Sequence, residues 1–207
     1  MRRVIASMLA MASVTCGGNT PWNRVQIPDS DLSVCMPAAL EQHQARIEIE
    51  GSEVTEHALY ANVGTGWLVK TAGIRYSASS YTPGAGDHRV PAADGVAKFS
   101  RERILQSSAE REITTSTVFA SRVEAAGLGG QEFILKRSAG LTAIYFGEAV
   151  IGDDQNVISL RVAAPSYCDV ANGITAMLSS IRRGIEDSTT DCKGLPATEC
   201  TPAAGGS

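Results

Sequence analysis

The strongest constraint on the fold is a stretch of the chain, residues 113–165, in which side chains alternate between apolar and polar over several short segments. In its last segment, NVISLRVAAP, Ile158 and Leu160 fall on one side, and Ser159 and Arg161 fall on the other. A period of two residues is typical of a strand with one buried face. Strands that follow one another through short turns pair antiparallel. This part of the chain therefore predicts an antiparallel sheet.

Further strands are expected nearer the start of the chain. WNRVQIP and DLSVCMP each end at a proline, which favours extended backbone before it. ARIEIEGSEVTEHALYANV has the pattern of a hairpin that turns at Gly51 and Ser52. These segments add strands to the predicted sheet.

Two other segments have the spacing of a helix. VAKFSRERILQSSAEREI, residues 96–113, carries charged side chains on one side of a predicted helix. The second segment has one continuous apolar stripe and is expected to end at Gly184. The stripe consists of Val170, Ile174, Met177, Leu178 and Ile181, with Arg182 and Arg183 after it. The predicted fold class is α+β, a central antiparallel β-sheet flanked by helices that closes with a C-terminal amphipathic helix.

The start of the chain has the pattern of an export signal. Arg2 and Arg3 precede an uncharged run at residues 4–14, which is shorter than the ~20 residues that a membrane-spanning helix needs. The segment SVTCGGN resembles a bacterial lipobox, which would make Cys16 the lipid attachment site. The pattern Ala-Met-Ala just before it would instead release a chain that begins at Ser13. Both alternatives remain open.

The predicted export signal, strands, helices and polar tail together divide the chain into four parts. They are a signal peptide at 1–15, a tether at 16–21, an α+β domain at 22–183, and a polar, disordered tail at 184–207 that carries two cysteines. The candidate disulfide cysteines are Cys35, Cys168, Cys192 and Cys200. Their even number permits full pairing in an oxidising compartment. Three connectivities are open, among them a small Cys192–Cys200 loop and a link from the tail to Cys168. We expect the protein in the cell envelope, as a membrane-anchored lipoprotein or in periplasmic or secreted form.

The charge balance restricts the classes of partner. The chain has 18 Lys and Arg against 22 Asp and Glu, so that loss of Arg2 and Arg3 leaves 16 against 22, a balance of −6. An acidic chain without a basic stripe is not expected to bind nucleic acid. Membrane attachment is expected only through a lipidated Cys16, because no other apolar run approaches spanning length.

Known catalytic and metal-binding motifs do not occur in the sequence. His43, His57 and His88 lie far apart, without the spacing of a local metal site. Asp153 and Asp154 lie between two predicted strands and are interpreted as a hairpin turn, and GLGGQE is also interpreted as a turn. No G-x-S-x-G segment is present. We therefore expect no catalytic residue, no metal and no cofactor.

One loop is the exception to this absence of candidate functional residues. YTPGAGDHRVPAADG, residues 81–95, is the longest segment without predicted structure inside the domain, and long loops are often functional. Asp87, His88 and Arg89 bring an acid, an imidazole and a guanidinium together there. An alternative function is therefore a small hydrolase or ligand carrier with its pocket under this loop.

Several segments together resemble the PsbP-like domain family. They are WNRVQIPDSDLSVCMP, HALYANVGTGWLVKTAG and GLGGQEFILKRSAGLTAIYFGEAVIGDDQNVISLRVAAP, the last leading to the terminal helix. The resemblance covers roughly residues 22–183. It implies a central antiparallel sheet flanked by helices and a non-catalytic role in binding or stabilising a partner. The favoured hypothesis is an exported binding or assembly module of the bacterial cell envelope with an envelope protein as partner, lipid-anchored if Cys16 is acylated.

Overall fold

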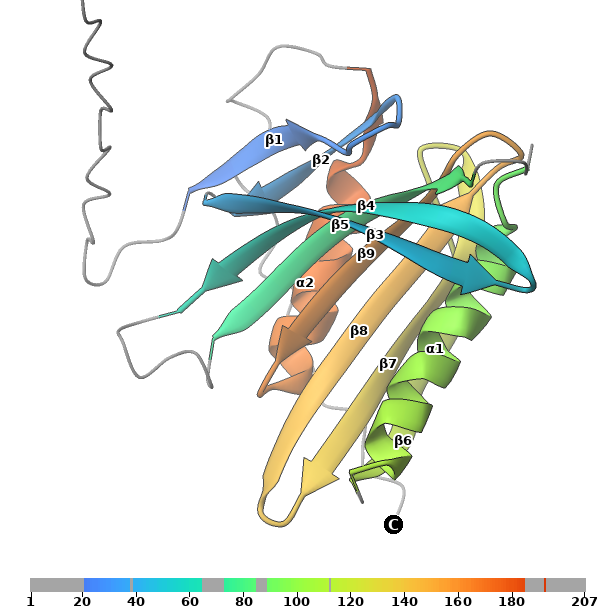
Figure 1. The fold of residues 1–207 in the computed structure, drawn as a ribbon. Coiled ribbons are helices and arrows are strands. Elements are labelled where there is room, and N and C mark those ends of the chain that lie inside the picture. The colour runs from blue at the N-terminus through green and yellow to red at the C-terminus, as the bar shows by residue number, and fades with distance from the viewer. Residues whose placement is uncertain are drawn as a thin grey trace, which may run out of the picture.

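The computed structural model describes residues 21–37, 39–64, 73–84, 89–111 and 113–184, together with Cys192. These residues form two antiparallel sheets and two helices (Figure 1). The strands are β1 (Trp22–Gln26), β2 (Leu32–Pro37), β3 (Leu40–Ile49), β4 (Ser52–Val63), β5 (Ile74–Pro83), β6 (Thr114–Ala125), β7 (Leu128–Ala139), β8 (Thr142–Gly152), β9 (Val157–Ala164) and β10 (Arg182–Arg183). The helices are α1 (Ala93–Ala109) and α2 (Tyr167–Ser180). No helix in these ranges is long and apolar enough to cross a membrane.

The large sheet has the strand order β3-β4-β5-β9-β8-β7-β6, and the small sheet has the order β1-β2-β10. Tight turns join the neighbouring strands. Glu50 and Gly51 connect β3 to β4 with φ of 52° and 85°, and Ala126 and Gly127 connect β6 to β7 with φ of 53° and 75°. Two successive positive φ values are the signature of hairpin turns that match the twist of the strands. The predicted hairpin is therefore confirmed, with its turn one residue earlier than expected.

One face of the large sheet is covered by α2 and by the small sheet. Ser166 caps the start of α2, its side chain accepting from the backbone N–H of Asp169. Val170, Ile174 and Met177 of α2 are fully buried in a core that also contains side chains of β2, β4, β5, β8 and β9. This apolar layer holds most of the large buried side chains and is the main hydrophobic core.

The opposite face is covered only in part, by α1. This helix lies along β6, β7 and β8 and touches β3 at one end (Figure 1). Val96 and Ala97 of α1 pack on a second core that includes Phe133, Leu135 and Val150. The remaining part of this face, on β4, β5 and β9, lies beside α1, and the candidate site is found there.

Two sequence-based expectations about local structure are corrected, one in full and one in part. The last helix ends at Ser180, because Ile181 is extended and buried, and Arg182 and Arg183 form β10 against β2. Of the segment GLGGQE, interpreted as a turn, Gly127 does lie in the turn between β6 and β7, whereas Gly129 and Gly130 lie in β7. An added Cβ at Gly130 would collide with the carbonyl of Val150, so the close pairing of β7 and β8 requires a glycine.

Candidate functional site

The floor of the candidate site is a buried network of polar side chains around Arg161 of β9. Its guanidinium donates from Nε to Glu148 Oε1 at 2.9 Å and from Nη1 to Glu56 Oε1 at 2.7 Å. Its Nη2 donates to the phenol oxygen of Tyr81 at 2.7 Å. Glu56, Tyr81 and Glu148 are 4%, 3% and 2% exposed. These charge-assisted hydrogen bonds are therefore shielded from water. In the protein interior such bonds are stronger than they are in water.

The register of four neighbouring strands brings these residues together. Glu148 of β8 lies directly opposite Arg161, and Glu56 of β4 lies directly opposite Tyr81 of β5. Strand β5 in turn pairs with β9. Since alternate residues of a strand share a face, all four side chains lie on the face that α1 partly covers.

The helix α1 is attached to this network through Ser100. The Ser100 hydroxyl donates to Glu148 Oε2, and the Ser159 hydroxyl donates to Glu148 Oε1. Ser100 and Ser159 are buried, at 6% and 0% exposure. Both oxygens of the Glu148 carboxylate are therefore hydrogen-bonded, and the middle of α1 is fixed over β8 by polar contacts.

Burial and charge together set the protonation of the network. Burial lowers the pKa of Arg161, but the charges of Glu148 and Glu56 outweigh this effect, and the pKa lies well above its usual value. Burial raises the pKa of Glu56, but the charge and hydrogen bond of Arg161 outweigh it, and the pKa of Glu56 is lowered. Burial raises the pKa of the Tyr81 phenol above its usual range. At neutral pH the network holds a charged Arg161, an ionised Glu56 and a protonated phenol.

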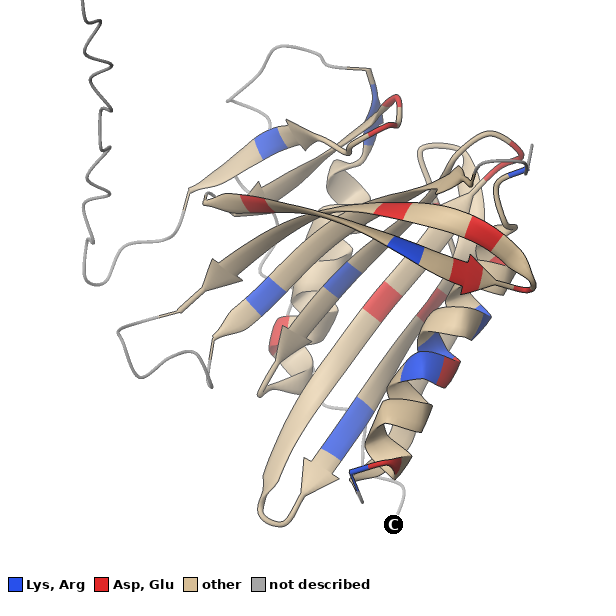
Figure 2. Cartoon of the chain, viewed as in Figure 1, with Lys and Arg blue, Asp and Glu red and all other residues tan. Residues whose placement is uncertain are grey.

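A groove of about 640 Å³ opens beside this network, between α1 and the strands of the same face. Five arginines line it against two glutamates, although the whole chain has a net charge of −4. The arginines are Arg75, Arg103, Arg111, Arg137 and Arg161. Figure 2 shows blue segments of β5, β7 and β9 around a red segment of β8. We call this site the basic groove, a positively charged hollow in an acidic protein.

The wall of the basic groove is one side of α1. Ser100, Arg103 and Ser107 line the groove from the helix, and Arg111 lines it from the turn after the helix. Side chains three or four residues apart lie on the same side of a helix, which explains why these residues share the groove. Arg103 and Arg111 are exposed, and within the described residues neither donates a hydrogen bond to another side chain.

Arg137 of β7 is held in place with a donor unsatisfied. Its Nε atom is buried and has no hydrogen-bond partner in the described part of the chain. Its guanidinium carbon lies 5.4 Å from the centre of the Phe146 ring, a cation–π distance. A buried donor without an acceptor is unfavourable, so this Nε is a polar group that the described part of the fold leaves unsatisfied.

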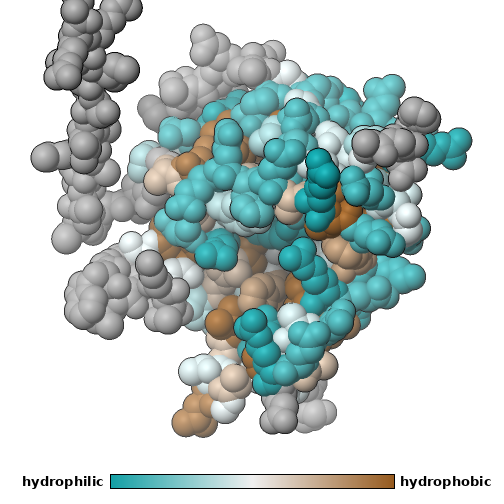
Figure 3. All heavy atoms as spheres, viewed as in Figure 1, coloured by the Kyte–Doolittle hydropathy of each residue, from teal (hydrophilic) through white to brown (hydrophobic). Residues whose placement is uncertain are grey.

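A second, more apolar hollow of about 690 Å³ continues the basic groove. The two hollows share Arg75, Phe146 and Ala163 as lining residues. Beyond them the second hollow is lined by Ile144 and Pro165, among others, and Ile144 is 42% exposed. Figure 3 shows hydrophobic residues exposed on this side of the molecule between hydrophilic ones. We call this extension the apolar groove.

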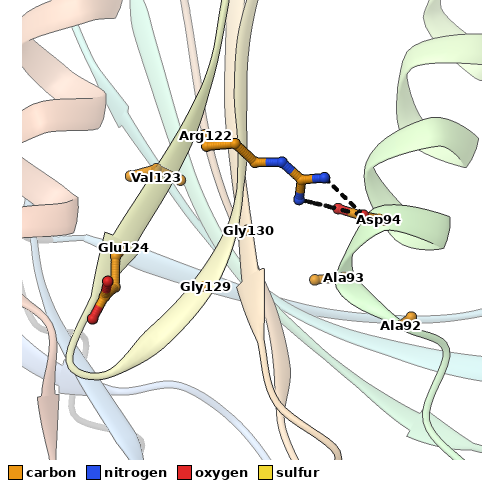
Figure 4. Close-up of a pocket in the computed structure, with 8 residues that line it drawn as sticks. All are labelled: Ala92, Ala93, Asp94, Arg122, Val123, Glu124, Gly129 and Gly130. Atoms are coloured by element: carbon orange, nitrogen blue, oxygen red, sulfur yellow. Dashed lines mark hydrogen bonds and ion pairs between the residues drawn. The ribbon is translucent and has the colours of Figure 1, made fainter.

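A further hollow, of about 560 Å³, lies at the start of α1 (Figure 4). Asp94 and Arg122 face each other across it, their closest atoms 3.0 Å apart, and Gln131 also donates to Asp94 at 2.7 Å. The charges of Asp94 and Arg122 are therefore paired with each other. Its arginine is 73% exposed, and ion pairs at that exposure contribute little to stability.

The predicted ligand loop is shorter than expected. Tyr81 to Pro83 belong to β5, and Ala93 to Gly95 belong to α1, because the strand ladder and the helix both extend beyond the pattern seen in sequence. Asp87 and His88 lie outside the described residues. Arg89 is exposed.

The cysteine pairing is partly visible. Cys35 of β2 is joined to Cys192, with their Cα atoms 5.8 Å apart, and both are buried. This pair excludes the small Cys192–Cys200 loop that the sequence left open. Cys168, in the first turn of α2, is also disulfide-bonded. Cys16 and Cys200 lie outside the described residues.

The histidines have separate surroundings. His57 Nδ1 lies 2.8 Å from Asp29 Oδ2, and its Nε2 lies 3.1 Å from Thr82 Oγ1. His43 lines the basic groove at its edge on β3. Across the described ranges no group of three or more His, Cys, Asp or Glu residues is placed to hold a metal ion.

Sequence reasoning missed the network around Arg161 and the arginines of the basic groove. Arg161 was assigned to the polar side of a strand with one buried face, whereas both faces of β9 are largely buried. A signal was present, since Glu148 and Arg161 each interrupt an apolar strand segment, in GEAVI and SLRVA. Buried charges are almost always paired, so two such interruptions of opposite sign indicate a buried pair.

Comparison with known proteins gives weak similarity of fold. No family model matches the chain, and no curated protein matches it. The solution structure of cyanobacterial PsbP (CyanoP) from Synechocystis sp. PCC 6803 aligns with 84% of this chain and 98% of its own, at a TM-score of 0.47 and 8% identity. The Pseudomonas aeruginosa protein PA94, of unknown function, aligns with 69% of this chain and 82% of its own, at a TM-score of 0.33 and 10% identity. Neither similarity assigns the chain to a family or transfers a function to it.

Proposed function

We propose that the chain is an exported, non-catalytic binding module of the bacterial cell envelope, built as a PsbP-like central sheet flanked by helices, and that its partner binds at the basic groove. The observation that carries the proposal is the excess of arginine in this groove within an acidic chain. A positively charged groove attracts an anionic partner and orients it.

The buried network supports a binding role over a catalytic one. Arg161, Glu56 and Glu148 direct their hydrogen bonds at one another and at neighbouring side chains. The pKa shifts of Arg161 and Glu56 move both groups away from neutral pH, whereas general acid–base catalysis favours groups that titrate near it. The network is therefore suited to hold the groove in shape.

Export is supported by the charged and then apolar start of the chain and by the disulfide between Cys35 and Cys192. Disulfides persist in oxidising compartments and are rare in the cytosol. Intact mass of the mature protein, measured without reduction, tests this part of the proposal. We expect either an acylated chain that begins at Cys16 or a chain that begins at Ser13, with Cys35 and Cys192 oxidised. A full-length chain with Met1 and free thiols would contradict export.

Photo-crosslinking in cells tests the binding site. A photo-reactive amino acid at Ser107 lies in the wall of the basic groove, and the same amino acid at Gln44, exposed on β3, serves as the matched control. We expect a discrete crosslinked species from position 107 that is absent from position 44, with mass spectrometry to establish whether it is a protein or a small molecule.

The competing outcomes are distinct. Equal crosslinking from both positions, or none from position 107, would show that the basic groove is not the binding site. A catalytic turnover assignable to the purified protein, with no envelope partner recovered, would replace the binding role by an enzymatic one.

A further inference from the structure

The basic groove and the apolar groove adjoin at Arg75, Phe146 and Ala163, and we call the two together the trough. Apart from Arg75, no charged side chain of the described residues lines the apolar groove. We propose that this trough binds a single-chain anionic amphiphile, an acyl or alkyl chain that ends in a carboxylate or a phosphate. The anionic head lies at the arginines of the basic groove, and the chain lies along the apolar groove. This inference rests on the proposed binding function and names the chemical class of the ligand.

The arginines of the basic groove outnumber the glutamates that line it, five against two. Arg161 is paired with Glu56 and Glu148, the two glutamates of the groove lining. Across the described ranges Arg137 forms no ion pair, and Arg103 forms none either, although its charge helps to lower the pKa of Glu56. The remaining positive charge selects for an anion and against a cation.

Arg137 is the residue best placed to bind the head directly. Its buried Nε lacks an acceptor, and contact with the Phe146 ring limits the orientations of its guanidinium. A planar guanidinium held in one orientation presents paired donors that match the two oxygens of a carboxylate or phosphate. We infer that an acidic head group in the groove meets the terminal Nη groups of Arg137, which lines it, and not the buried Nε.

The part of the trough that would hold the alkyl chain of the ligand begins at the Phe146 ring. Phe146 lines both grooves, and from it the apolar groove continues past Ala163 to Ile144 and Pro165. Each groove falls within the ~300–1,000 Å³ typical of small-molecule sites. Phe146 thus lies against Arg137 on one side and lines the path proposed for the alkyl chain, so that one molecule with a charged and an apolar end would contact both.

Isothermal titration of the purified, disulfide-intact protein with four dodecyl compounds tests the inference. Dodecanoate and dodecyl phosphate are the anionic probes, and dodecyltrimethylammonium and dodecyl maltoside are the cationic and neutral controls, all below their micellar concentrations. Acetate and inorganic phosphate test the head groups alone. We expect binding of an anionic probe at least about tenfold tighter than of either control, and no comparable binding of the head groups alone. The two anionic probes distinguish a carboxylate ligand from a phosphate ligand.

Four variants locate the site. Arg137→Gln is expected to weaken binding of the anionic probe by about tenfold or more, whereas Arg46→Gln, at an exposed arginine of β3 outside the grooves, leaves it unchanged. Ile144→Ser is expected to weaken binding as well, whereas Leu105→Ser, at 38% exposure on α1, is its control. Thermal unfolding of each variant establishes that it is folded.

Equal binding of cationic and anionic probes, or equal loss in Arg137→Gln and Arg46→Gln, would overturn the inference. If no amphiphile binds while crosslinks from position 107 to a protein persist, the ligand class is wrong and the proposed binding function stands. If the crosslinks are absent as well, both fail.

Discussion

The two faces of the large sheet are buried in different ways. Under α2 the contacts are apolar, and Val170, Ile174 and Met177 are fully buried. Beside α1 the sheet instead buries Arg161 and Glu148, and a charged groove opens next to them. The same strands, β8 and β9, contribute to both faces, because alternate residues point in opposite directions.

Because the two faces are buried differently, we infer that one face contributes mainly to the stability of the fold and the other mainly to binding. Apolar packing is non-directional and closes a core without defining a site. A hydrogen-bonded ionic network fixes side-chain positions, although it contributes less stability for the same buried volume. The α2 face thus stabilises the fold, and the α1 face holds Arg161 in a fixed position beside an open groove.

The largest expected effect comes from removing the central charge of the α1 face. Arg161→Met leaves Glu148 and Glu56 buried without their counter-charge, and we expect a loss of about 3–5 kcal/mol in the free energy of unfolding at pH 7. Urea denaturation measures it, with Arg46→Met as the exposed control.

The pH dependence of this loss has a definite sign. In the wild type the pKa of Glu56 is lowered, so its contribution is present above the pKa of the unfolded chain and is lost as pH falls through the folded pKa. In Arg161→Met the main influence that opposes burial is gone, although the hydrogen bond of Ser79 and the charge of Arg103 remain, and burial favours the protonated carboxyl of Glu56. The difference between variant and wild type should therefore shrink toward about pH 4. A loss below about 1 kcal/mol, or one independent of pH, would contradict the network.

A smaller effect is expected from crowding the α2 face. An added methyl group at Gly147 of β8 would collide with Val170 Cγ1 and approach Ile174 Cγ1 to 3.1 Å. We expect Gly147→Ala to cost about 1–3 kcal/mol. Gly129→Ala is the matched control, because nothing lies within 4 Å of its added methyl group. Equal unfolding free energies for the two variants would show that α2 does not pack tightly on β8.

The smallest expected effect compares one residue type on the two faces. Glu132 of β7 lies opposite Ala149, which belongs to the core under α2. Burial raises the pKa of Glu132, whereas the pKa of Glu56, on the other face, is lowered. A raised folded pKa means that the wild type gains stability as pH falls through it. We expect Glu132→Gln to stabilise the protein at pH 7 by less than about 1 kcal/mol, and the gain to vanish at acid pH. A destabilised variant at pH 7 would mean that the Glu132 carboxylate has a favourable partner.

The sequence predicted the strands of the second half well, because period-two alternation and short turns act locally. The turn at Asp153 is an example, since its carboxylate accepts from the backbone N–H groups of Gln155 and Asn156. Both helices were expected, and only their ends differ. The boundary at Ser180 was missed because burial of Ile181 and pairing of β10 with β2 depend on tertiary contacts.

The candidate site was not predictable in the same way. A period of two shows that Ser159 and Arg161 share a face, but not whether a helix covers it. The pairing of Arg161 with Glu56 spans 105 residues of sequence, and the pairing of Cys35 with Cys192 spans 157. Contacts of this range depend on strand order, which no local pattern encodes.

The link between Cys35 and Cys192 also has a mechanical consequence. Strand β10 has only two residues, so its hydrogen bonds to β2 would open under little force. The disulfide joins Cys192 covalently to the buried interior of β2. A pull applied at Cys192 is therefore transmitted through the disulfide to β2, the inner strand of the small sheet, and not through β10.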